Sequence, residues 1–413
     1  MISCAFLARG ARVRATTNVA VRFGLRREEE RYGIGMPFLA SSTVADGRAV
    51  WTCAGNAVRS AIVAARDDDT PSLFGDAIEL PGAARASAKR GRTDASIASE
   101  CTEELRALGA RLSARHGTRL GARLGAGFHL GTSSWSFPGW RGLVYRDAAS
   151  ESSLARDGLI AYAQHPLFRS VGVDKTYYRP APRDEFVRLA AQVPADFRFL
   201  VKAWRALVEP EPFGGGSSAA FLNAAIARRE FVEPAFDGLG EKCGPLLFQF
   251  PPMRLADARA AREFLAALQN FLQALPRGPL YAVEVRNHSL VGPELGELLA
   301  ETGVAPCLTV HPTMPDVETQ SRELALDPAR PLVMRWMLRG NHRYEEAKDL
   351  YAPFDRIVEP DDTSRDALAR LAHAAVTAGL GAWVIVNNKA EGSSPRSVER
   401  LARAIVDIDG ASA

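Results

Sequence analysis

The sequence predicts an α/β fold, a (β/α)8 TIM-type barrel preceded by a largely disordered N-terminal extension. From Phe128 onward, short apolar segments alternate with helical segments, the order typical of parallel βαβ units. Eight such segments with seven crossovers favour a closed barrel. No GxGxxG motif follows the first strand, which argues against an open dinucleotide-binding sheet.

The apolar segments give the predicted strands, and the amphipathic segments between them give the helices. The strands centre on residues 128–132, 170–176, 197–203, 246–250, 280–286, 305–310, 332–338 and 382–387. The helices are expected at residues 153–164, 183–191, 218–239, 257–274, 293–302, 363–378 and 395–406. The connection at residues 316–326 has the weakest pattern.

The chain divides into four parts. Residues 1–98 offer no sustained strand or helix pattern and predict a disordered leader, or a start placed too far upstream with Met36 as the true one. The opening to Arg27 is rich in arginine and lacks acids, so a transit peptide is an alternative. Spaced leucines predict an amphipathic helix within residues 99–127 that leads into the barrel, 128–408, and a short tail follows at 409–413.

Composition sets limits on class and compartment. The five cysteines are far apart and form no metal-binding or CxxC spacing, which predicts reduced thiols in a cytoplasmic protein. No apolar stretch is long enough for a membrane span. The basic excess lies in the first third, and arginine far outnumbers lysine, a bias that we ascribe to a GC-rich, bacterial genome.

Six motifs, in order, resemble the YecE-like family (domain of unknown function 72). They read GTSSWSFPGWRGLVY, VGVDKTYYRP, FRFLVKAW, PLLFQFPP, YAVEVRNHSL and IVNNKAEGSSPRSVERL, over about 280 residues. The resemblance implies a TIM-type barrel in a bacterial cytosolic protein and no particular substrate. The chain departs from the family at Gly172, where Glu is usual, at Met337 and Leu338, where His-Gly is usual, and in lacking a Thr-His pair after strand three.

Polar residues at the ends of barrel strands are the candidate site, because the carboxyl ends of the strands carry the active site in this fold. The rule selects Asp174, Tyr178, Lys202, Gln249, Glu284, Arg286, His311, Arg335 and Asn388. By period two, Glu284 and Arg286 share the inward face of their strand. A Glu284–Lys202 pair would leave Arg286 for an anionic ligand, with Glu284, Lys202 and Asp174 as catalytic groups. The alternative is an ion network that only fixes strand register. A Schiff base on Lys202 is a further alternative.

Three other features extend the prediction. The loop with Asn388 and Gly392, followed by Ser394 as N-cap of a helix, predicts exposed amides for a phosphate or other anion, or else an ordinary capped helix. Trp135 belongs to an aromatic cluster that either stacks on a ring-bearing ligand or covers the barrel edge. Asp174, Glu284 and His311 offer a divalent metal site as an alternative to the prediction of no cofactor.

The function predicted is an enzyme that acts on a small anionic, phosphorylated or carboxylated substrate by proton transfer or hydrolysis, with hydrolase, lyase and isomerase all open. The alternative is a noncatalytic module that binds a phosphate ligand or nucleic acid. The Ser-Leu-Phe segment at residues 72–74 resembles peptides that dock on bacterial sliding clamps, or it anchors the leader on the barrel.

Overall fold

The computed structural model describes residues 97–114, 127–210, 218–326, 330–338 and 342–408, and three short strands near the N-terminus. The strands β1 (Ile2–Cys4), β2 (Ala40–Ala45) and β3 (Arg48–Cys53) form an antiparallel sheet of order β1-β3-β2. These three strands were not predicted from the sequence. Met36, the segment at residues 72–74 and the tail at 409–413 lie outside the described residues.

Eight parallel strands close into a barrel, as predicted. They are β4 (Gly127–Thr132), β5 (Ser170–Val173), β6 (Arg198–Lys202), β7 (Cys243–Gln249), β8 (Tyr281–Glu284), β9 (Ala305–Val310), β10 (Leu332–Trp336) and β11 (Gly381–Val386). The last strand, β11, pairs with the first, β4, and completes the ring. A close approach between strands explains a glycine in β4: a Cβ on Gly131 would lie 1.9 Å from the carbonyl oxygen of Ser170 in β5.

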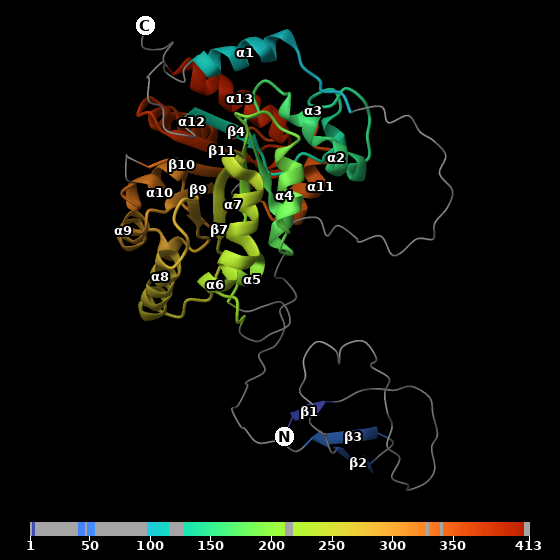
Figure 1. The fold of residues 1–413 in the computed structure, drawn as a ribbon, viewed down its shortest axis with the longest axis vertical. Coiled ribbons are helices and arrows are strands. Elements are labelled where there is room, and N and C mark those ends of the chain that lie inside the picture. The colour runs from blue at the N-terminus through green and yellow to red at the C-terminus, as the bar shows by residue number, and fades with distance from the viewer. Residues whose placement is uncertain are drawn as a thin grey trace, which may run out of the picture. The chain divides into compact units, whose positions relative to one another are not determined.

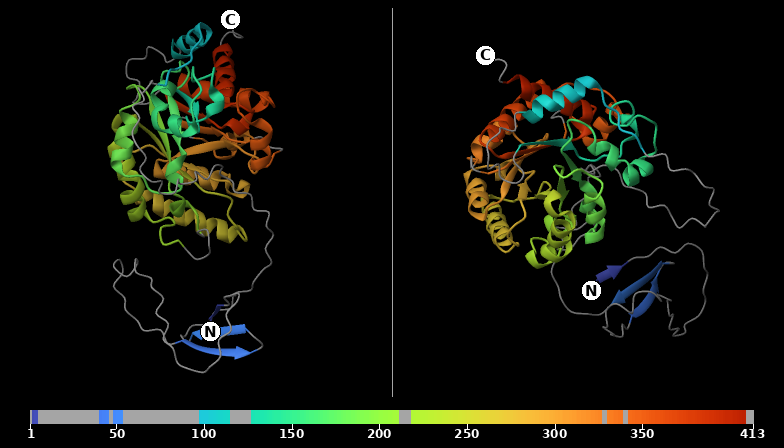
Figure 2. Two further views of the ribbon diagram at one scale, coloured as in Figure 1. Left: turned by 90° about the vertical axis from the view of Figure 1, so that its right-hand side faces the viewer. Right: turned by 45° about the horizontal axis from the view of Figure 1, so that its top comes forward.

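Helices surround the strands, as Figure 2 shows in its right-hand view. They include α2 (Glu151–Asp157), α3 (Leu159–Ala163), α4 (Arg183–Ala190), α7 (Glu233–Leu239), α8 (Ala258–Gln273), α9 (Pro293–Thr302), α12 (Asp362–Thr377) and α13 (Ser394–Asp407). The predicted helix at 218–239 is α6 (Ala224–Ala227), a π-helical turn (Arg228–Val232) and α7. The weak connection contains α10 (Val317–Glu323), whereas α5 (Arg205–Val208) and α11 (Tyr344–Tyr351) were not predicted.

The helix α1 (Glu103–Ala114) belongs to the barrel unit and lies along α13 (Figure 1). Its apolar face buries Leu105, Leu108 and Leu112. The segment before it is attached as well, because Glu100 N–H donates to the Val144 carbonyl (2.8 Å) and Arg146 N–H donates to that of Ala98 (3.0 Å). The ordered barrel unit therefore begins ahead of its first strand.

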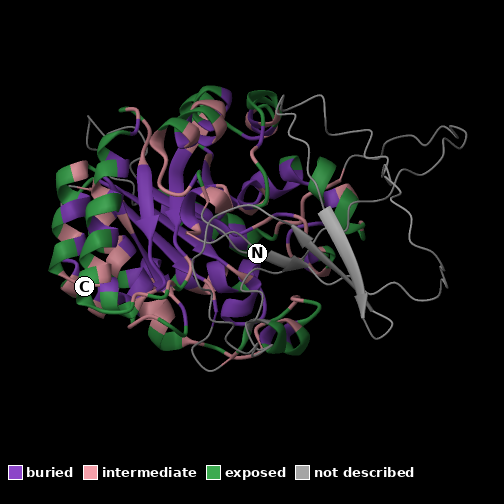
Figure 3. Ribbon diagram, turned by 90° about the horizontal axis from the view of Figure 1, so that it is seen from below, coloured by how far each residue is buried: buried purple, intermediate pink, exposed green. Residues whose placement is uncertain are grey.

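The barrel interior is apolar at one end and polar at the other. Leu200, Leu247, Val333, Trp383 and Ile385 belong to the apolar interior cluster. Further toward the carboxyl ends of the strands, buried polar side chains replace them, and Figure 3 shows that the strands are buried along their length. A layer of this kind requires bonded partners, since an unpaired buried charge is costly. Among the described residues, no helix is long and apolar enough to cross a membrane.

Candidate functional site

The centre of the polar layer is a carboxylate between two guanidinium groups. Arg286 Nε donates to Glu284 Oε1 (2.5 Å), and Arg335 Nη1 donates to Glu284 Oε2 (2.9 Å). The side chain of Glu284 has no exposed surface, and those of Arg286 and Arg335 are 4% and 1% exposed. Glu284 and Arg286 thus face inward, as period two predicts. The prediction that Arg286 is left without an ionic partner is wrong, because it binds Glu284.

This arrangement determines the charge of Glu284. Burial opposes ionisation of the carboxyl group, but the charges of Arg286 and Arg335 outweigh burial and lower its pKa to about 2. A carboxylate with so low a pKa is a weak base at neutral pH. Glu284 is therefore better suited to hold the two guanidinium groups in position than to accept a proton.

Lys202, at the end of β6, is the second feature of the layer. Its ammonium nitrogen lies 3.8 Å from the ring centroid of Tyr177. Burial lowers the pKa of Lys202 to about 7; Asp174 and Glu284 act against this shift, and the two arginines act with it. Near neutral pH the amine therefore exists in both protonation states. This is the property that a group needs in order to accept and return a proton.

Asp174 and His311 stand at the rim of the layer. Asp174 Oδ2 lies 3.7 Å from Arg335 Nη2, and its Oδ1 has no hydrogen-bond partner among the described residues. Burial and the neighbouring Arg286 lower the pKa of His311 to about 3, so its ring is neutral. His311 Nδ1 lies 2.9 Å from Thr313 Oγ1, and the Thr313 backbone nitrogen lies 3.3 Å from the same ring atom.

Gln249 and Thr309 contribute neutral polar groups inside the barrel. Gln249 in β7 pairs in register with Glu284 in β8 and is fully buried. Within the described part of the chain, neither end of its amide has a hydrogen-bond partner, nor does Thr309 Oγ1. The Thr309 backbone is held from outside the strands, because Gln320 accepts from its N–H (3.0 Å) and donates to its carbonyl (2.8 Å). Sequence reasoning missed Thr309, although period two from Cys307 marks it as inward.

The loop after β11 does not have the predicted form. Helix α13 begins at Ser394, so Ser393 is the N-cap and the prediction was one residue late. The side-chain oxygen of Asn388 accepts from Ser394 N–H (2.9 Å) and Ser394 Oγ (2.8 Å). Both residues are buried, so the expected exposed amide at Ser394 is wrong. Gly392 has φ +114°, and a Cβ there would lie 2.7 Å from the Arg356 carbonyl oxygen, which explains the glycine by packing.

The aromatic residues divide between packing and surface. Trp135 is buried, and its indole N–H donates to the Leu154 carbonyl (3.1 Å), so its polar group is already bonded within the fold. Tyr178 is 46% exposed and meets Tyr177 edge to face, with 5.5 Å between ring centroids. Of the predicted ligand-binding residues Trp135 and Tyr178, only Tyr178 is exposed enough to contact a ligand from solution.

The metal alternative finds no support in the geometry. Over the described residues, no three His, Cys, Asp or Glu side chains converge as metal ligands, and Asp174, Glu284 and His311 form no such group. The barrel layer is thus an arrangement of one lysine, two arginines and two carboxylates.

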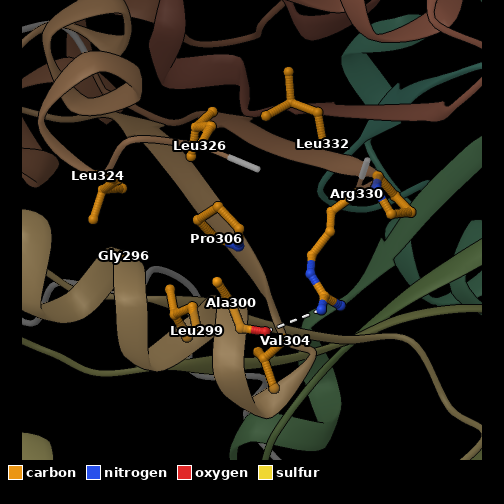
Figure 4. A pocket seen from close by; sticks show the side chains of 10 residues that line it. Gly296, Leu299, Ala300, Val304, Pro306, Leu324, Leu326, Arg330 and Leu332 are labelled. Carbon is orange, nitrogen blue, oxygen red and sulfur yellow. Dashed lines mark hydrogen bonds between the residues drawn. The ribbon is translucent and has the colours of Figure 1, made fainter. Parts of the chain in front are cut away.

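A small cavity lies away from this layer, near the amino ends of β9 and β10 (Figure 4). Apolar side chains form most of its wall, and Arg330 donates to the Ala300 carbonyl beside it (3.0 Å). Its volume of about 30 Å³ is room for one or two water molecules. The cavity is too small for a substrate.

Comparison of the sequence with models of known protein families assigns the chain to one family. The family model described as "Protein of unknown function DUF72" matches residues 129–410. No curated protein matches the chain.

Solved structures of DUF72 family proteins are similar to this chain. Two, from Enterococcus faecalis V583, are 17% and 15% identical, cover 67% and 68% of this chain and 95% and 99% of their own, and have TM-scores of 0.49 and 0.45. One from Thermotoga maritima MSB8 is 20% identical, covers 68% of this chain and 99% of its own, and has a TM-score of 0.45.

Proposed function

Because the chain belongs to the DUF72 family, whose description names no reaction, we propose from the geometry of the barrel that it is an enzyme for a small anionic substrate, with Lys202 as the proton-transferring group. The observation that carries the proposal is the buried amine of Lys202, with a pKa of about 7, beside two guanidinium groups. Perturbed titratable groups of this kind are concentrated at functional sites.

Anion binding falls to Arg286 and Arg335. A guanidinium has five N–H donors in a planar fork that matches a carboxylate or phosphate. Glu284 occupies only part of each fork, and Arg335 Nε has no hydrogen-bond partner among the described residues. Glu284 therefore acts as a positioning residue that keeps both forks oriented in the barrel.

Proton transfer falls to Lys202. The neutral amine accepts a proton from a C–H or O–H group next to the bound anion, and the resulting ammonium returns it to another atom of the substrate. Asp174 stabilises the ammonium form, because its charge raises the pKa of Lys202. Isomerisation, elimination and hydrolysis all contain such a step. The isolated cysteines support a cytosolic setting, and the excess of arginine over lysine supports a bacterial one.

The test combines binding and turnover. A panel of phosphorylated and carboxylated metabolites is screened by calorimetry for binding and by NMR for conversion, with the full chain and with Lys202→Met. We expect Lys202→Met to bind the converted compound within a few-fold of the parent protein and to lose turnover at least 100-fold. Turnover of the parent protein should change with an apparent pKa near 7. Full turnover by Lys202→Met contradicts the assignment.

The alternative function is a noncatalytic module that binds nucleic acid. The same proteins distinguish it from an enzyme when binding is measured at several salt concentrations. Binding to a phosphate backbone weakens steeply with salt, because many counterions are released. A single anion held in the barrel responds far less. A steep salt dependence, with no converted compound in the panel, would replace the enzyme proposal.

A further inference from the structure

Three side chains in the polar layer carry hydrogen-bonding atoms that the fold does not use. Gln249 is fully buried, and both its Nε2 and its Oε1 lack a hydrogen-bond partner among the described residues. Thr309 Oγ1 and Asp174 Oδ1 share this property. Gln249 and Thr309 lie near the carboxyl ends of β7 and β9 and face the barrel interior by strand alternation, and Asp174 follows the last residue of β5 at the rim of the layer.

Such atoms need an explanation, because almost all buried polar groups in proteins are hydrogen-bonded. A hydrocarbon side chain of the same shape would serve packing better than an unbonded amide. The amide of Gln249 therefore adds no hydrogen bond to the stability of the barrel among the described residues.

The hydrogen-bonding properties of these four side-chain atoms restrict which chemical groups a ligand can place beside them. Gln249 Nε2 needs an acceptor, Gln249 Oε1 and Asp174 Oδ1 need donors, and the Thr309 hydroxyl uses either. A phosphate dianion or a carboxylate only accepts, so the anionic group alone leaves two oxygens unbonded. An ammonium group would donate, but it would meet the positive charges of Arg286 and Arg335. Hydroxyl groups both donate and accept, and they carry no charge.

We propose that the substrate is a polyhydroxylated anion, a sugar acid or sugar phosphate with at least two free hydroxyl groups. The inference rests on the proposed function, since Arg286 and Arg335 bind the anionic group. Gln249 pairs with two neighbouring hydroxyls and acts as a specificity-determining residue. A site built to hydrogen-bond hydroxyls rejects an analogue that lacks them, because its own polar atoms then stay unbonded.

The experiment compares matched pairs of probes at millimolar concentration by thermal unfolding and calorimetry with the full chain. Gluconate is paired with hexanoate, and ribose 5-phosphate with pentyl phosphate; sorbitol controls for hydroxyls without charge. We expect at least one hydroxylated anion to bind ten-fold or more tightly than its deoxy partner, and sorbitol not to bind. In Gln249→Met the preference should vanish while the melting temperature is kept or raised. Gln273→Met, at an exposed glutamine of α8, is the matched control and should change neither.

Each other outcome has a defined meaning. Equal binding of hydroxylated and deoxy anions overturns the inference and leaves the proposed function standing. Binding of none of the anions overturns both. A sharp loss of stability in Gln249→Met with an unchanged preference would make Gln249 structural and overturn its role in specificity.

Discussion

Glu284 shows at the scale of one residue how the layer is held together. Its carboxylate is fully buried and bonded to Arg286 and Arg335, so the three side chains form one ionic unit. When one charge of a buried ion pair is removed, the other charge stays in the interior without a partner. This lowers the free energy of unfolding far more than the loss of an exposed ion pair does.

We predict that Glu284→Gln lowers the free energy of unfolding by about 3 to 5 kcal/mol, because two cations then remain in the interior with a neutral partner. Urea unfolding measures the change. Adding Arg335→Met should recover part of the loss. Glu263→Gln is the control: Glu263 pairs with Arg259 on the surface of α8, at 64% exposure, and should change stability by less than about 0.5 kcal/mol. An unchanged midpoint in Glu284→Gln would mean that the ionic unit does not stabilise the fold.

Lys202 gives a prediction about pH. Its pKa in the folded protein is about 7, below the usual value of 10.5, so between these values the unfolded chain binds more protons than the folded one. Stability contributed by this residue must therefore rise as the pH increases from 7 toward 10. We expect unfolding free energies at pH 7, 8 and 9 to rise less steeply in Lys202→Met than in the parent protein. Equal slopes for the two proteins contradict the low pKa.

Local sequence pattern predicted part of this site. Period two placed Glu284 and Arg286 inward, since alternation along one strand needs no knowledge of the fold. The Arg335 partner, 51 residues further on, was not predictable, because the stagger of strands around a closed barrel decides which side chains meet. Because Glu284 is paired with two arginines, we propose a positioning role for it in place of the expected role as proton acceptor.

At the scale of elements, the loop between β11 and α13 is buried by another segment. Val358 N–H donates to the Glu391 carbonyl (2.8 Å), and the Asp361 N–H donates to the Glu391 carboxylate (2.8 Å). The connection between α11 and α12 thus covers this loop. No local sequence pattern identifies such a covering connection, so the helix start near Ser394 and the glycine before it were interpreted from the sequence as an anion site.

We predict that Gly392→Ala destabilises the protein more than Gly379→Ala does. Both glycines have positive φ, +114° and +80°, so both substitutions strain the backbone by about 1 kcal/mol or more. Only at Gly392 does a Cβ meet backbone, at 2.7 Å from Arg356 O, whereas nothing lies within 4 Å at Gly379. The difference between the two denaturant midpoints measures the close contact at Gly392 together with the greater backbone strain at its φ of +114°. Equal losses would show that the covering segment yields freely.

At the scale of the whole molecule, the described part of the barrel unit extends ahead of β4 to include residues 97–114. The backbone of residues 98–100 bonds to that of residues 144–146, and α1 buries three leucines. Apolar periodicity identified all eight strands because each is buried on both faces, and it identified α1 by its leucines. It did not identify the attachment of residues 98–100, because a single backbone bridge has no sequence signature.

We predict that deletion of residues 1–96 leaves a protein with the cooperative unfolding of the full chain, whereas deletion of residues 1–126 does not. The longer deletion removes α1 and exposes the apolar surface beneath it, which costs stability in proportion to the area uncovered. Calorimetric unfolding of both proteins decides the matter. A fall in the transition midpoint on removal of residues 1–96 would show that the earlier segments stabilise the barrel.

The pairing of β11 with both β10 and β4 has a consequence for biosynthesis. The contact joins residue 381 to residue 127, so the ring stays open until β11, the last strand of the barrel, has left the ribosome. During that interval the nascent sheet presents two unpaired edges, at β4 and β10, which are templates for pairing with other chains. The interval between synthesis of β10 and β11 is therefore the one in which the sheet has both of these edges open to pairing with other chains.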